Sequence, residues 1–182
     1  MSLIHEIAQG NTDALEQLYK QYKDRVYRLA LSLSHDMHLA EDITQDTFLH
    51  VQERARTYRR EGSEAAWIIA IARNLTYDSL RRRSREVTGD IHSFEPDGML
   101  PPQSAALLRQ DSGQPDPASN LYFLDLLAFL TGDEKELVCL RILAGLSWKE
   151  IGRITGQSAG ACRKRYARSL EKLRRNLVQP SP

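Results

Sequence analysis

The sequence has no segment that reads as a membrane anchor or an export signal. Its longest uncharged apolar run, AWIIAIA at 66–72, is far too short to span a bilayer. The first residues, MSLIHEIAQG, lack a basic stretch followed by an apolar stretch long enough for export. We therefore expect a cytoplasmic protein with no membrane insertion.

Cysteine is scarce, which argues against redox chemistry or a metal cluster. The two cysteines, Cys139 and Cys162, lie far apart, and no His or Cys stands at ligand spacing beside either one. Each falls on the apolar side of an expected helix. We interpret both as reduced, buried side chains, and a redox or metal role is the less favoured alternative.

Catalytic patterns are missing as well. The five histidines are scattered, no glycine-rich phosphate loop appears, and the neighbouring carboxylates Glu41 and Asp42 would point in different directions from a helix. We expect a protein that is not an enzyme and that needs no cofactor or metal. His35 and His38 flank an expected turn and should be exposed to solvent.

The formal net charge of +1 hides a strong segregation of charge along the chain. By segment, the net charge is −5 for residues 1–53, +6 for 54–85, −5 for 86–120 and +5 for 121–182. Such a mosaic indicates separate acidic and basic surfaces, although the average alone would argue against a nucleic-acid binder.

Apolar residues recur at helical spacings, and no stretch shows the period-two pattern of strands joined by hairpin turns. One helix should begin near Thr12 or Asp13, with that residue as its N-cap. A second helix should cover LAEDITQDTFLHVQERA, and a third should cover AAWIIAIARNLTYDSLRRR. Residues 86–120 are rich in Pro, Gly, Ser and Asp, which is typical of a linker. We predict an all-α fold with two small helical domains, 1–85 and 121–182, joined by this flexible acidic linker. The second domain should hold about four helices.

The second domain contains a candidate helix-turn-helix in LSWKEIGRITGQSAGACRKRYARSL, residues 146–170. Ser147 and Glu150 have the spacing of a capping box, so a short helix should begin after Ser147. Gly156 should end that helix in the left-handed conformation, and Ser158 can cap the next one. The inward-facing residues of the next helix should be Cys162, Tyr166, Leu170, Leu173 and Leu177.

The helix that follows Ser158 should expose small residues in its first turn and basic residues after it. These residues are Ala159, Gly160, Arg163, Lys164, Ala167 and Arg168. Small residues let the backbone approach a duplex closely, and Arg163 and Lys164 can reach guanine edges or phosphates. We interpret the hairpin as DNA-binding. The alternative is a solvated basic face on a pair of surface helices.

Three stretches of the chain resemble the sigma factors of the extracytoplasmic-function type, the two-domain members of the sigma-70 family that direct bacterial RNA polymerase to promoters. They are DALEQLYKQYKDRVYRLAL with AEDITQDTFLHV, then AWIIAIARNLTYDSLRRR, and finally GLSWKEIGRITGQSAGACRKRYARSLEKLRR. The resemblance implies a subunit that associates with core polymerase and directs promoter-specific initiation. The alternative is a helix-turn-helix regulator that binds operator DNA without being a polymerase subunit.

The resemblance also implies a role for each group of residues. Core polymerase would be bound by Asp42, Gln45 and Asp46 of the AED helix. The minus-ten promoter element would be read and melted by Asn74 together with Tyr58, Arg59, Arg60, Gly62, Ser63, Arg73, Arg81, Arg82 and Arg83. The minus-35 element would be bound by Arg163, Lys164, Ala167 and Arg168, with Arg165 on the flank making phosphate or intramolecular contacts. The implied partners are core RNA polymerase, promoter DNA and an anti-sigma protein.

Two positions depart from the family's pattern. Glu64 stands where the family often has Phe, three residues before Trp67, and this places a carboxylate beside the expected DNA pocket. Ala167 stands where a larger side chain is common, which would leave fewer base contacts. Trp67 matches the family's usual Trp, and we expect it to pack mainly in the core.

Overall fold

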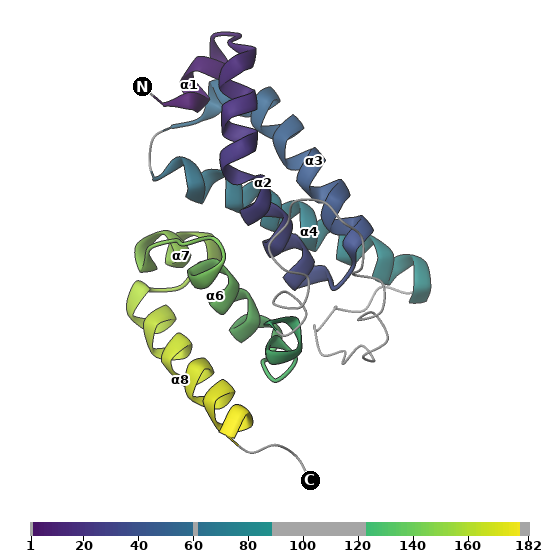
Figure 1. Ribbon diagram of the computed structural model, residues 1–182, viewed down its shortest axis with the longest axis vertical. Coiled ribbons are helices and arrows are strands. Elements are labelled where there is room, and N and C mark those ends of the chain that lie inside the picture. The colour runs from purple at the N-terminus through teal and green to yellow at the C-terminus, as the bar shows by residue number, and fades with distance from the viewer. Residues whose placement is uncertain (1, 60–61, 89–122, 179–182) are drawn as a thin grey trace.

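The computed structural model describes residues 2–59, 62–88 and 123–178, and every regular element in these ranges is a helix (Figure 1). The all-α prediction is therefore confirmed. The predicted linker, apart from 86–88, and Arg60 of the predicted promoter-binding loop lie outside the described residues. None of the described helices is both long and apolar enough to cross a membrane. The elements are α1 (Leu3–Ala8), α2 (Thr12–Ser34), α3 (Met37–Arg54), the 3-10 helix η1 (Ala55–Thr57), α4 (Glu64–Thr88), α6 (Gly132–Ile142), α7 (Trp148–Thr155) and α8 (Ala159–Val178).

The starts of α2 and α3 are fixed by capping side chains. Asn11 Oδ1 accepts hydrogen bonds from the backbone N–H groups of Asp13 at 3.0 Å and Ala14 at 3.3 Å, so Asn11 is the N-cap and the prediction of Thr12 or Asp13 is wrong by one or two residues. The α2 helix ends where His35 adopts a left-handed φ of 54°, and Asp36 then caps α3 by accepting from Leu39 N at 2.9 Å. The short helix α1, which precedes this pair, was not predicted.

The first domain is built from α2, α3 and α4, which pack on one another with α1 and η1 at one end (Figure 1). The buried apolar stripes of these helices meet in its core, as helical periodicity predicts. Tyr19 and Phe48 add an edge-to-face aromatic pair, with ring centroids 4.8 Å apart, between α2 and α3. The fully buried large side chains of this core include Ile4, Leu18, Val26, Leu29, Ile43, Ile68 and Ile69.

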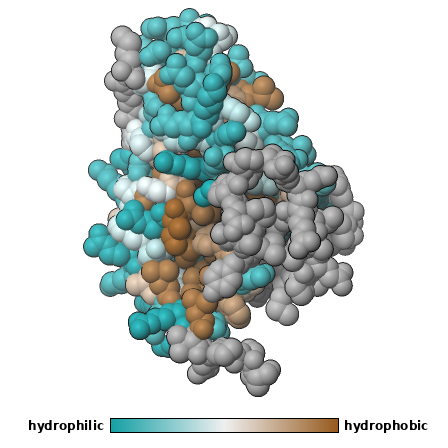
Figure 2. Space-filling model, in the orientation of Figure 1, coloured by the Kyte–Doolittle hydropathy of each residue, from teal (hydrophilic) through white to brown (hydrophobic). Residues whose placement is uncertain are grey.

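The second domain consists of α6, α7 and α8 with a short helical segment at residues 123–127. Thr131 and Glu134 form a capping box at the start of α6, and Glu134 accepts from the backbone N–H of Thr131 at 3.0 Å. Figure 2 shows apolar residues gathered on one face around α6 and α8, whereas the same face of the first domain is mostly hydrophilic. The exposed large apolar side chains here are Phe129, Ile142, Leu170 and Leu177.

The two domains lie against one another, and their buried apolar residues form one continuous cluster. Leu127, Leu137 and Leu140 of the second domain belong to the same set of contacts as Val26 and Ile68 of the first. In Figure 1 the α6 helix lies between α8 and the first domain. Sequence periodicity predicts each domain's apolar faces but does not show that these faces share one core.

The prediction that Leu170 and Leu177 of α8 face inward is wrong. Leu170 and Leu177 of α8 are 39% and 49% exposed, whereas Ser169 is fully buried. The buried line on α8 runs through Cys162, Ser169 and Leu173, because 3.6 residues per turn rotate position 170 away from the line that starts at Cys162.

His35 is also less exposed than expected. Its side chain lies against the second domain, where Lys135 Nζ is 2.8 Å from His35 Nε2. Burial and the neighbouring Lys135 lower the pKa of His35 from 6.5 to about 4. The ring is therefore neutral at physiological pH and can accept a hydrogen bond from the Lys135 ammonium. His38 is exposed, as predicted.

Candidate nucleic-acid interface

The helix-turn-helix in the second domain has the local geometry that its sequence predicts. Ser147 Oγ and Glu150 make the reciprocal bonds of a capping box, with the backbone N–H of Ser147 donating to Glu150 Oε2 at 2.9 Å. Gly156 ends α7 with a left-handed φ of 70°. Ser158 Oγ then accepts from Ala161 N at 3.1 Å and caps α8. These bonds fix the turn between α7 and α8.

A close backbone approach inside the turn requires glycine at position 152. A Cβ atom placed there would lie 2.5 Å from the carbonyl oxygen of Gln157, which is far inside van der Waals contact. The carbonyl of Gly152 itself accepts from Gln157 N at 3.0 Å. Gly152 was not singled out from the sequence, because a glycine within a helix gives no local sign of what packs against it.

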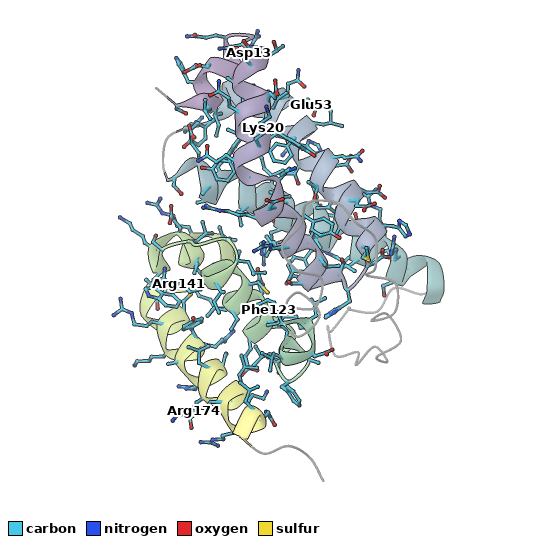
Figure 3. All side chains as sticks on the ribbon, in the orientation of Figure 1. Asp13, Lys20, Glu53, Phe123, Arg141 and Arg174 are labelled. Atoms are coloured by element: carbon cyan, nitrogen blue, oxygen red, sulfur yellow. The ribbon has the colours of Figure 1, made fainter. Side chains whose placement is uncertain are left out.

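The outward face of α8 presents the predicted DNA-binding side chains together. Arg163, Lys164, Ala167 and Arg168 are all exposed. Arg165 instead turns toward α6 and pairs with Asp133 at 2.9 Å, in agreement with an intramolecular role on the flank. Arg141, labelled in Figure 3, holds the connection between α6 and α7, since its guanidinium lies 4.8 Å from the ring centroid of Trp148 and donates to the Leu146 carbonyl at 2.7 Å.

An open groove of about 440 Å³ lies between the first domain and α7 of the second, and several of the predicted promoter-melting residues line it. Its first-domain lining includes Tyr58, Arg59, Gly62, Ser63, Trp67 and Asn74. Tyr58 and Trp67 form a tilted ring pair with centroids 5.1 Å apart, and Tyr58 Oη donates to the Gly62 carbonyl at 3.2 Å. Trp67 therefore has two roles, because it packs against the core and also forms part of the groove wall.

The departure at position 64 does not bring a carboxylate into this groove. Glu64 stands in the first turn of α4, where a negative charge favours the helix N-terminus, and its Oε1 accepts a hydrogen bond from Ser2 Oγ. The groove lining does not contain Glu64.

The arginines of α4 fall into two groups. Arg81, Arg82 and Arg83 are exposed near the C-terminal end of the helix, where Arg83 pairs with Asp36 at 2.5 Å and Arg81 with Asp78 at 3.4 Å. Exposed pairs of this kind are weak and exchange readily with other anions. Arg73, by contrast, is engaged with the second domain.

Arg73 lies in a small cluster made by both domains. Its Nε donates to Glu136 Oε1, and the guanidinium lies 4.9 Å from the Tyr77 ring centroid. Tyr77 Oη donates to the other oxygen of Glu136 at 3.2 Å. Burial, together with the Glu136 charge, raises the pKa of Tyr77 well above its ordinary value, so the phenol keeps its proton.

Glu150 of α7 also contacts the first domain, although its sequence position predicts only a capping role. Its Oε1 accepts from the backbone N–H of Ser63 at 3.2 Å and from Ser63 Oγ. Partial burial opposes ionisation, but the hydrogen bonds from Ser147 and Ser63 outweigh it and lower the pKa of Glu150 from 4.5 to about 2. Glu150, Arg153 and Ile154 of α7 thereby form one wall of the groove.

The acidic face of α3 is exposed to solvent, and its residues are not part of the groove lining. Asp42, Gln45 and Asp46 project into solvent at helical spacing. Leu49, one turn further along the same face, is 57% exposed. Leu49 was not singled out from the sequence.

Two family models match the chain. The model described as Sigma-70 region 2 matches residues 18–86, and the model described as Sigma-70, region 4 matches residues 120–173. The first match includes the groove and the acidic face, and the second includes the helix-turn-helix.

Curated sigma factors resemble the chain over most of its length. It is 34% identical to the ECF RNA polymerase sigma factor BldN of Streptomyces coelicolor, over 97% of this chain and 65% of BldN. It is 35% identical to the RNA polymerase sigma factor CarQ of Myxococcus xanthus, over 91% of this chain and 90% of CarQ. The chain thus spans slightly less than two thirds of BldN but most of CarQ.

Two solved structures share the fold. One is CnrH in complex with the cytosolic domain of CnrY, with a TM-score of 0.70 at 20% identity, covering 98% of this chain and 97% of that chain. The other is the sigma factor RpoE in complex with the anti-sigma factor NepR from Bartonella quintana, with a TM-score of 0.68 at 24% identity, covering 91% of this chain and 98% of that chain.

Proposed function

Because the chain belongs to the extracytoplasmic-function sigma factors of the sigma-70 family, we propose that it binds bacterial core RNA polymerase and directs it to specific promoters. The observation that carries the proposal is the presence, in one chain, of a basic outward face on α8 of the helix-turn-helix and of aromatic and amide side chains of the first domain that line a groove. A stand-alone operator-binding protein would need only the first of these.

The second domain would bind the minus-35 element as duplex DNA. Its capped turn holds α8 so that Gly160 and the side chains of Arg163 and Lys164 face outward. No atom lies within 4 Å of a Cβ built on Gly160, so a duplex backbone could approach there. Arginine and lysine contacts to base edges and phosphates would supply selectivity and affinity. Ala167 and Arg168 complete the surface.

The first domain would bind the minus-ten element after it opens. A base that leaves the duplex needs an aromatic surface to stack on and polar groups to read its edge. Tyr58 and Trp67 would provide the aromatic surface, and Asn74 would both donate to and accept from a base. The surrounding loop, with Arg59, Arg60, Gly62 and Ser63, and the arginines 73, 81, 82 and 83 would hold the strand.

The acidic face of α3 would be the core polymerase contact. Asp42, Gln45 and Asp46 favour a basic protein partner, and the neighbouring Leu49 would be buried on binding. RNA synthesis would be carried out by the polymerase, so we propose that this cytoplasmic subunit has no catalytic activity of its own. An anti-sigma protein is a further proposed partner, supported by the RpoE structure that contains one.

A DNA-binding comparison with and without core polymerase tests this proposal. We expect the purified chain alone to bind promoter duplexes weakly, and the complex with core enzyme to bind selected promoters and to open them. Asn74→Ala should reduce permanganate reactivity of the opened minus-ten thymines while leaving the closed complex intact. Strong, sequence-specific duplex binding by the chain alone, unaffected by core polymerase, would instead show an operator-binding regulator.

A further inference from the structure

The short helix α1 contacts the segments on both sides of the loop that carries part of the predicted minus-ten surface. On one side it packs on η1, the 3-10 helix that directly precedes Tyr58. On the other side, Ser2 Oγ donates a hydrogen bond to Oε1 of Glu64, the first residue of α4. Ser2 is the residue immediately before α1. A single helix therefore anchors both ends of this loop.

The hydroxyl of Ser2 serves this long-range contact and does not cap its own helix. Ser2 is the N-cap residue of α1, a position at which serine ordinarily accepts a hydrogen bond from a backbone N–H two or three residues further on. The Ser2 side chain makes no such bond and donates instead to Glu64, 62 residues along the chain. The start of α1 is thus held by the start of α4 and not by a local cap.

The core of the first domain fixes the rest of α1. Ile4 is fully buried and Ile7 is 7% exposed, and both belong to the same apolar cluster as Ala55 of η1. Glu64 is also close enough to α2 to act on Tyr22, because burial, together with the Glu64 charge, raises the pKa of the Tyr22 phenol. The Ser2 hydrogen bond therefore lies where α1, α2 and the start of α4 meet.

Each of the two anchored segments carries one aromatic ring of the groove. Tyr58 directly follows η1, and Trp67 lies three residues after Glu64 in the first turn of α4. Their ring centroids are 5.1 Å apart. Aromatic rings attract one another only in close and defined arrangements, so a shift of either segment would change the surface on which a base could stack.

We propose that Ser2 and Glu64 are positioning residues for the minus-ten surface, because their hydrogen bond ties α1 to α4 and so sets how Tyr58 and Trp67 face an unpaired base. The inference rests on the proposed function. Ser2 and Glu64 are not among the residues that line the groove, so they act through the position of α4. A relative with Phe at the position of Glu64 cannot form this hydrogen bond, and the tether is therefore a feature of this chain.

The test uses the fluorescence of Trp67 in the full chain. The sequence contains two tryptophans, so Trp148→Phe leaves Trp67 as the single reporter. In this background, Ser2→Ala and Glu64→Ala each remove the hydrogen bond, whereas Glu64→Gln keeps an oxygen that can accept it. The matched control is Glu16→Ala, which removes an exposed glutamate whose partner lies in the same helix, α2. Thermal melts establish that each variant is folded.

We expect acrylamide to quench Trp67 more strongly in Ser2→Ala and Glu64→Ala than in the background chain, and equally in Glu64→Gln, Glu16→Ala and the background. With core polymerase, permanganate reactivity of the minus-ten thymines should fall about fivefold in the first two variants, as expected for the loss of one hydrogen bond. The amount of closed complex should not change. The double variant Ser2→Ala with Glu64→Ala should lose no more than either single variant, because both remove the same bond.

Unchanged quenching and unchanged promoter opening in Ser2→Ala and Glu64→Ala would overturn the proposal. Stronger quenching without a loss of opening would overturn it too, since the bond would then be structural only. A loss in Glu64→Gln as large as that in Glu64→Ala would exclude the hydrogen bond as the cause.

Failure of the proposed function has a different appearance. No chain, the background included, would then open a promoter with core polymerase, although Trp67 quenching would still respond to Ser2→Ala. That result would overturn the role of Ser2 and Glu64 in promoter opening together with the proposed function.

Discussion

Replacing Gly152 with alanine should destabilise the second domain, because the new methyl group would meet the backbone of the turn. The Cβ would lie 2.5 Å from the Gln157 carbonyl oxygen and 3.4 Å from the backbone nitrogen of Ala159. A carbonyl oxygen cannot rotate away as a long side chain can, so α7 and the turn would have to move apart. The hydrogen bond from Gln157 N to the Gly152 carbonyl would be strained by the same movement.

The change in unfolding free energy caused by Gly152→Ala is the difference between a gain in helix propensity and a steric cost. Alanine is about 1 kcal/mol more favourable than glycine within a helix. Forcing a methyl group into a packed contact costs about 1–3 kcal/mol, and a backbone obstacle places Gly152→Ala at or beyond the upper end. We expect a net loss of about 2 kcal/mol. For a chain of this length, that loss corresponds to a fall in Tm of roughly 4–8 °C.

Differential scanning calorimetry measures this directly, with Gly160→Ala as the control. Gly160 is also in a helix, but nothing lies within 4 Å of a Cβ at that position. Gly160→Ala should therefore melt at the wild-type temperature or slightly above it. If Gly152→Ala melted as high as the wild type, the turn would not depend on the close approach at position 152.

Three further predictions concern the other surfaces. The double variant Arg163→Ala with Lys164→Ala should lower run-off transcription from a minus-35-dependent promoter by about tenfold or more, since a good base contact is worth about 1–3 kcal/mol. Equal transcription from wild type and variant would show that α8 does not recognise the promoter. Asp42→Ala with Asp46→Ala should weaken binding to core polymerase in a fluorescence titration, and unchanged affinity would place the polymerase contact elsewhere. The pKa of Glu150 is about 2 in the folded chain against an ordinary 4.5, so its contribution to stability is complete above pH 4.5 and is lost as the pH falls toward 2. The stability difference between wild type and Glu150→Gln should therefore shrink over that range in urea titrations, and a constant difference would contradict the assigned pKa.

The sequence was sufficient for the features that depend on neighbouring residues. The Ser147 capping box, the left-handed Gly156 and the exposed acidic face at Asp42 and Asp46 each follow from spacing within a single helix or turn. Cys139 and Cys162 are buried and free, as their places in the apolar pattern indicate. Burial also raises the pKa of the Cys139 thiol to about 12, so it stays protonated.

The sequence was insufficient wherever the answer depends on contacts between distant segments. Glu136 and Arg73 are 63 residues apart, and nothing local marks them as partners. His35 lies beside an expected turn at the end of α2, yet Lys135 of the second domain contacts it. Leu170 is a different case, since it fits a repeat of four but is exposed because the 3.6-residue turn of α8 rotates it away from the buried line through Cys162 and Leu173.

Run-off transcription on a library of promoter fragments measures whether this chain gives core RNA polymerase its promoter selectivity. With purified core enzyme and the wild-type chain, we expect transcripts from a small set of fragments that share a minus-35 and a minus-ten element. Core enzyme alone should give none of them. An identical set of transcripts with and without the chain would show that the chain does not select promoters.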